Sequence, residues 1–311
     1  MRRFILRSLL FAVLVVAVFG GLCALEVGFE LKQYYGVEAV AGPQATAVVC
    51  SDSQTDMGVD PSVVPEIFNF SAHGRLVDQY ELALIDAFAV NPGRFKTVIV
   101  DLSPASVLES MDKPLAEMIF SSKYYLLHFL HLKENRRDLS GIGTVFRDNM
   151  VGRRFRLLSR ALRGVKKFES SIRGGFTPEA ASLLRTNPKH YETLLNVKVG
   201  QVRGLENLSA ESPVFEAVDQ IIALAKAHGA QVVLTTTPWR PDVRERCGKA
   251  RLDHFTEVMR TYAARRQCPY LDFLRREFPD DHWYDCVHLN LKGAGVFSPI
   301  LRDALREGGL L

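Results

Sequence analysis

The sequence lacks the features that mark several large classes of protein. Its 311 residues contain no long low-complexity tract and no internal repeat, which argues against solenoid and fibrous architectures. The formal net charge of +4 is too small to indicate nucleic-acid binding. No Cys-x-x-Cys motif is present, so a zinc knuckle is not supported. The composition, 47% hydrophobic and 24% charged, suits one sizeable domain or one domain with an insertion.

The N-terminus combines an apolar run with basic residues on one side. Residues 8–25 carry no charged side chain, and three arginines precede them. The run is long enough for a transmembrane helix and longer than the usual core of a signal peptide. The arginines indicate a cytoplasmic N-terminus and an extracytoplasmic remainder. We therefore predict an uncleaved signal anchor at residues 1–26 and a juxtamembrane linker at 27–44, with a cleaved signal as the alternative.

Predicted strands and helices alternate along most of the remaining chain. Apolar, β-branched runs predict strands at residues 45–50, 97–102, 231–235 and 270–272. Helical periodicity and end signals predict helices at residues 75–90, 213–228, 250–265 and 291–306, with Ser212 as an N-cap. This alternation predicts an α/β fold, in which a parallel sheet carries helices on both faces. The functional site of such a fold lies beyond the carboxyl ends of its strands.

Residues 105–210 do not follow this alternation and are predicted to form a mostly helical insertion. Within it, residues 147–170 read as a basic amphipathic helix, which suits an anionic membrane surface or polymer. A solvated basic face over an ordinary core contact is the alternative. The apolar stretch 124–130 is either core or a docking surface for a membrane partner.

Three residues have the types and spacing of a catalytic triad. Ser53 follows the first predicted strand directly, and Asp285 precedes His288 by three residues. A serine hydroxyl is a weak nucleophile until a base takes its proton, and that base needs a group to orient it. One short loop can supply both Asp285 and His288. We predict Ser53 as nucleophile, His288 as general base and Asp285 as its partner, against the alternative of a turn serine and a polar surface loop.

Other chemistry is possible for the same segments but is less well supported. A metal site has suitable residue types near the C-terminus, although their spacing is irregular. These residues are Asp280, Asp281, His282, Asp285 and His288. Cys50 or Cys286 is a second conceivable nucleophile. We predict no cofactor and no metal.

The motifs resemble those of the SGNH/GDSL hydrolase superfamily. Ser51-Asp52-Ser53 is similar to its Gly-Asp-Ser block, and Asp285-x-x-His288 to its last block. Residues 69–74 are similar to its second block. The closest resemblance is to membrane-anchored bacterial members, which often read "GDSQT…DP…N(L/F)S…G" and end in "D…HLN…GA". The resemblance covers residues 45–104 and 214–308, and it implies a three-layer, flavodoxin-like sheet.

The resemblance also implies roles for further residues. The backbone N–H groups of Ser53 and Gly74 are expected to form an oxyanion hole, and Asp52 is expected to be structural. The family's third block, Gly-x-Asn-Asp, is missing, and losing such a donor costs roughly 10²–10³ in rate. We expect Ser103 to substitute for it and, with Trp239 and His73, to contact substrate; an ordinary turn histidine is the alternative for His73.

An envelope acyl hydrolase or acyltransferase is the function that the resemblance implies. It would act through an acyl-Ser53 intermediate on O-acylated carbohydrate or another envelope polymer. Proteins of polysaccharide O-acetylation and of D-alanyl-lipoteichoic-acid biosynthesis are similar. A membrane-bound O-acyltransferase is the expected partner, and the cytoplasmic (inner) membrane is the expected location, with the domain in the periplasm. The alternative is an inactive glycan-binding or scaffold subunit.

Four cysteines lie outside the predicted anchor, and an even number in an oxidising compartment permits disulfides. They are Cys50, Cys247, Cys268 and Cys286. The family fold would bring Cys50 and Cys286 near enough for a disulfide, but four ordinary buried or free thiols are the favoured interpretation.

Overall fold

The computed structural model describes the chain in two long stretches and a few short pieces. These are residues 40–112, 176 and 182–311, with 3–4, 7–11, 13–14, 18 and 21 near the N-terminus. No helix within these residues is long and apolar enough to span a membrane. Most of the predicted anchor, the basic helix at 147–170 and the apolar stretch at 124–130 lie outside them.

Five parallel strands form one sheet in the order β2-β1-β3-β4-β5. Their bounds are Ala47–Val49 (β1), Ile67–Asn69 (β2), Thr97–Asp101 (β3), Gln231–Thr236 (β4) and Tyr270–Asp272 (β5). This is the strand order of flavodoxin-like folds. The predicted α/β class with a parallel sheet is therefore confirmed.

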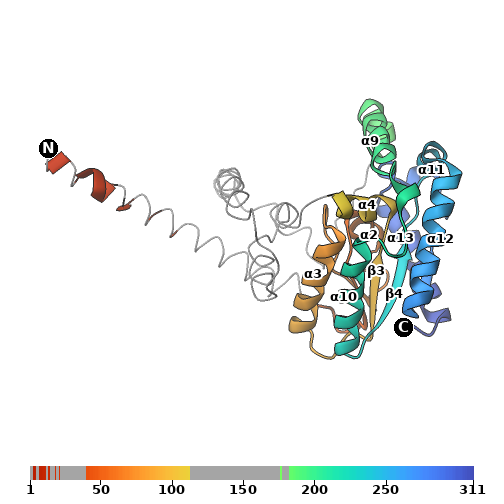
Figure 1. Cartoon of the computed structure of the whole chain (residues 1–311), viewed down its shortest axis with the longest axis horizontal. Coiled ribbons are helices and arrows are strands. Elements are labelled where there is room, and N and C mark those ends of the chain that lie inside the picture. Colours follow the sequence, from red (N-terminus) through yellow and green to blue (C-terminus); the bar gives the residue numbers. More distant parts are fainter. Residues whose placement is uncertain are drawn as a thin grey trace.

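Apolar side chains cover both faces of the sheet. Val48, Val98 and Val232 belong to the core on one face, whereas Val49 and Ile99 belong to the core on the other. Both faces are buried because each is covered by helices, which explains why the central strands read as continuous apolar runs. In Figure 1, strands β3 and β4 of the sheet are visible between the helices that cover it.

The helices divide between the two faces. The first face carries α3 (Val77–Val90), α10 (Val214–Ala227) and α12 (Lys249–Arg266). The second face carries α13 (Leu291–Glu307), which also packs against the short helix α2 (Ser53–Gly58). Except for α2, for which no helix was predicted, these helices lie close to the predicted ranges. The start of α10 differs by one position, because Pro213 and not Ser212 occupies its N-cap.

Strand β2 was not predicted from the sequence. It has three residues, too few to show a strand period, and it lies at the edge of the sheet. It nevertheless matters for the site, because the segment after it runs beside α2: the backbone N–H of Ala72 donates to the carbonyl of Ser51 over 3.1 Å.

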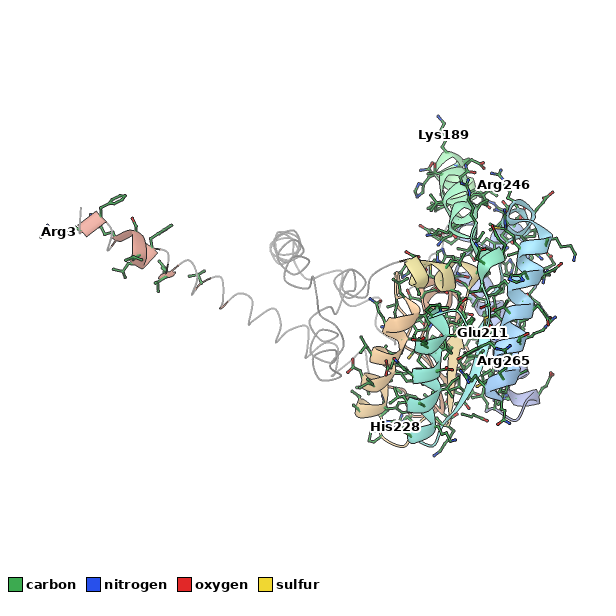
Figure 2. The ribbon with its side chains drawn as sticks, viewed as in Figure 1. Arg3, Lys189, Glu211, His228, Arg246 and Arg265 are labelled. Carbon is green, nitrogen blue, oxygen red and sulfur yellow. The ribbon has the colours of Figure 1, made fainter. Side chains whose placement is uncertain are left out.

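The described ends of the predicted insertion are helical. They are α4 (Pro104–Asp112), α8 (Leu183–Thr186), α9 (Pro188–Gln201) and η2 (Leu205–Asn207). Two further short elements, α11 (Pro241–Cys247) and η3 (Asp280–His282), follow β4 and β5. Helix α9 projects from the end of the domain where α2 and α4 lie (Figure 1). Lys189 marks that end in Figure 2, and His228 marks the opposite end.

Candidate active site

Ser53 is the first residue of α2, just past the carboxyl end of β1. The Asp52 side chain caps this helix, accepting a 2.8 Å hydrogen bond from the Gln54 backbone N–H. Asp52 thus has the structural role that we expected for it, as the N-cap of α2. A strand followed at once by a capped helix turns the chain sharply, and that turn presents the Ser53 side chain at the carboxyl edge of the sheet.

A closed loop before α13 holds Asp285 and His288. The Asp285 Oδ1 atom accepts hydrogen bonds from the backbone N–H groups of Val287 and His288, each over 2.9 Å. The Tyr284 N–H donates to the His288 carbonyl over 2.9 Å, which closes the loop. Asn290 then caps α13 through the N–H groups of the next turn. The backbone of the loop is therefore fixed at both ends.

The three predicted triad residues form one hydrogen-bonded chain. Ser53 Oγ lies 2.7 Å from His288 Nε2, and His288 Nδ1 lies 2.7 Å from Asp285 Oδ2. Burial by itself raises the pKa of the Asp285 carboxyl, but the His288 ring and the loop N–H groups together lower it below its usual value. An ionised Asp285 orients His288 so that Nε2 can accept the serine proton.

Residues 69–74, which follow β2, support α2 through the side chain of Asn69. Asn69 Nδ2 donates to the carbonyls of Thr55 and Val59, both over 2.8 Å. Gly74 adopts a left-handed backbone with φ of +69°, which glycine accepts without strain. Among the contacts of the described residues, neither the Ser53 nor the Gly74 backbone N–H donates to the protein.

The three residues predicted to contact substrate lie in different surroundings. Ser103 is fully buried, and its hydroxyl accepts from the Ser106 N–H as part of the cap of α4. Trp239 is also fully buried, with its indole N–H donating to Gln54 over 2.9 Å. The substrate predictions for Ser103 and Trp239 therefore find no support in their positions. His73 is half-exposed, with its ring centroid 6.3 Å from that of His288.

A buried polar network behind Ser53 was not predicted. Gln54 Oε1 accepts from Trp239 Nε1 and from Thr237 Oγ1, each over 2.9 Å. Asp101, at the end of β3, lies 3.1 Å from both Thr235 Oγ1 and Thr237 Oγ1. Burial and the neighbouring Asp52 raise the pKa of the Asp101 carboxyl well above its usual value. The network joins α2 to the ends of β3 and β4. The one sign of it in the sequence is an aspartate, Asp101, at the end of an apolar predicted strand.

The alternative chemistries receive no structural support. Cys50, Cys247, Cys268 and Cys286 are free. Burial raises the pKa of both Cys50 and Cys286 to about 12, so neither thiol is activated as a nucleophile. Within the described residues, no group of three or more histidine, cysteine, aspartate or glutamate side chains is placed to hold a metal ion.

The chain thus combines a parallel α/β sheet with a hydrogen-bonded Ser–His–Asp chain beyond the carboxyl ends of its strands. Residues 183–296 match the family model described as the GDSL-like Lipase/Acylhydrolase family. The matched range includes Asp285 and His288 and supports ester hydrolysis as the general chemistry. Ser53 lies outside that range and joins it through the hydrogen bond to His288. No curated protein matches the chain.

The chain is also similar to solved structures at low sequence identity. A GDSL-like lipase from Bacteroides thetaiotaomicron is 11% identical, with a TM-score of 0.41, over 90% of this chain and 97% of that chain. LAE5, an alpha/beta hydrolase enzyme from the metagenome of Lake Arreo in Spain, is 14% identical, with a TM-score of 0.39, over 86% and 97%.

Proposed function

We propose that this protein is a serine-dependent acyl hydrolase or acyltransferase that works through an acyl-Ser53 intermediate. The observation that carries the proposal is the hydrogen-bonded chain from Ser53 through His288 to Asp285. The family match over residues 183–296 supports the same ester chemistry.

The first half of the reaction forms the acyl-enzyme. His288 Nε2 takes the Ser53 proton as Oγ attacks the ester carbonyl, and Asp285 stabilises the imidazolium that forms. The N–H groups of Ser53 and Gly74 donate to the oxyanion. As the tetrahedral intermediate collapses, His288 gives the proton to the departing alcohol. Water or another alcohol then attacks acyl-Ser53, and the same proton transfers run in reverse.

The substrate and setting are part of the proposal. An O-acylated carbohydrate or envelope polymer suits the motif resemblance to membrane-anchored bacterial members. The apolar residues 8–25 with their preceding arginines support an inner-membrane anchor and a periplasmic domain. A membrane-bound O-acyltransferase would then be a natural partner, delivering or receiving the acyl group.

Labelling by a fluorophosphonate probe tests the proposed chemistry, because the probe reacts with activated serines. We expect the full-length protein to be labelled and Ser53→Ala and His288→Ala to show no labelling. A folded wild-type protein without labelling would contradict an autonomous acyl-enzyme mechanism. That result would favour the second candidate, an inactive glycan-binding or scaffold subunit, which the missing Gly-x-Asn-Asp block motivates.

A further inference from the structure

The short helix α2 contacts two histidines from different segments. Its first residue, Ser53, lies 2.7 Å from His288. One turn later Asp56 pairs with Nδ1 of His73. The site therefore contains two histidine–aspartate pairs, of which the proposed mechanism uses only His288 and Asp285.

The His73 pair has a buried half and an exposed half. Asp56 is only 1% exposed, whereas the His73 side chain is 55% exposed. The buried carboxylate fixes the ring through Nδ1, so Nε2 lies on the edge turned away from Asp56. A histidine held by a buried carboxylate is a positioned hydrogen-bonding group and not a freely rotating surface side chain.

The two histidine rings are neighbours without being bonded to each other. Their centroids are 6.3 Å apart and their planes differ by 24°. Even with nitrogens turned toward each other, that separation exceeds the hydrogen-bond length of about 3 Å. A substrate that bears two adjacent hydroxyl groups has the size to reach both rings, one hydroxyl at His288 and the other at His73.

We propose that His73, held by Asp56, is a specificity-determining residue that binds the alcohol part of the ester, and that this alcohol carries neighbouring hydroxyl groups. The inference rests on the proposed acyl-Ser53 chemistry. In the second half-reaction one alcohol oxygen attacks the acyl carbon, the bond from Ser53 Oγ to that carbon breaks, and His288 carries the alcohol's proton to Oγ. His73 transfers no proton; it hydrogen-bonds the adjacent hydroxyl of the same alcohol. The substrate class is therefore a polyol, such as a glycerol or sugar unit.

A competition between two acceptors tests this role in the full-length protein. With p-nitrophenyl acetate as donor, 1,2-propanediol and 1-propanol are supplied at equal concentration, and the two acetyl esters are quantified by gas chromatography. The acceptors differ in one neighbouring hydroxyl. We expect the wild-type protein to favour the diol by roughly fivefold to tenfold, the effect of one hydrogen bond.

Variants assign that preference to His73. We expect His73→Ala to lose this preference and to give the two acetyl esters in nearly equal amounts. His73→Gln, which keeps a hydrogen-bonding side chain, should retain part of it. His228→Ala, an exposed histidine at the opposite end of the domain (Figure 2), should behave as wild type.

The outcomes separate this inference from the proposed function. A labelled wild-type protein that shows no preference for the diol, or that releases only acetate, overturns the role of His73, as does a preference that persists in His73→Ala. Loss of labelling in both His73 variants also overturns it, because His73 would then support the triad itself. An unlabelled wild-type protein instead overturns the acyl-enzyme chemistry on which the inference rests.

Discussion

Asp101 Oδ2 lies 3.1 Å from the hydroxyl oxygen of Thr237, in the buried network behind Ser53. The Thr237 hydroxyl carries one proton but has two acceptors within reach, Asp101 Oδ2 and Gln54 Oε1. The Gln54 oxygen is 2.9 Å away. If Thr237 donates to Gln54, a protonated Asp101 can donate to Thr237 and every contact is satisfied. A neutral Asp101 thus fits the proton count, and burial, which raises its pKa, favours the same state.

A neutral Asp101 makes stability depend on pH in a definite direction. Below about pH 4 the carboxyl is protonated in both the folded and the unfolded chain and contributes no difference. Above that pH the unfolded chain loses the proton and the folded chain keeps it, so folding becomes less favourable as pH rises, by up to about 1.4 kcal/mol per pH unit. We expect the stability of Asp101→Asn relative to wild type to increase from pH 4 to pH 7, measured by urea unfolding. A relative stability that falls over this range would mean that Asp101 is ionised in the folded protein.

Asp285 is predicted to matter through the orientation and charge state of His288. Asp285→Asn keeps the shape of the side chain but removes the charge that favours the imidazolium and the correct tautomer. We expect the rate of fluorophosphonate labelling to fall by roughly 10³–10⁴. Asp303→Asn, at an exposed aspartate on α13, serves as the matched control and should label at the wild-type rate. Equal rates for the two variants would remove Asp285 from the mechanism.

Asn69 is predicted to stabilise the helix that carries Ser53. Asn69→Ala removes the side-chain donor to the Thr55 and Val59 carbonyls and the acceptor of the Ser71 N–H. Because these groups are buried, we expect the free energy of unfolding to fall by about 2–3 kcal/mol. Asn196→Ala, at an exposed position of α9, should change it by less than about 0.5 kcal/mol. Thermal or urea unfolding measures both, and a cost for Asn69→Ala no larger than that of Asn196→Ala would be inconsistent with this support.

Gly293 is predicted to be required for the approach of α13 to the loop that carries His288. A Cβ atom there would lie 2.2 Å from the His282 carbonyl oxygen and 2.9 Å from a Leu289 side-chain atom. We expect Gly293→Ala to destabilise the protein and to slow labelling, since the shift reaches a neighbour of His288. Gly295→Ala in the same helix meets nothing within 4 Å and should stabilise by about 0.5–1 kcal/mol. Unfolding curves that rank the two variants the other way would contradict this packing.

Features encoded by short stretches of sequence were predictable. The class of the fold follows from alternating apolar runs, and one three-residue spacing placed Asp285 and His288 in the same loop. The resemblance strengthened the pairing of that loop with Ser53, which the structure brings to 2.7 Å from His288.

Contacts between distant segments that carry no motif were not predicted. Thr237 meets Asp101 and Gln54 only because β4 pairs with β3 beside the start of α2. The pairing of His73 with Asp56 depends on β2, a strand too short to show a pattern. Ser103 follows a strand in the sequence, but its burial under α4 decides its surroundings.

The hydrogen bond between Ser53 and His288 spans 235 positions of the chain. A growing or partly folded polypeptide therefore carries an ordinary, unreactive serine until the last helix has docked against the sheet. Reactivity toward a serine-directed probe should consequently report the fraction of molecules that have completed folding.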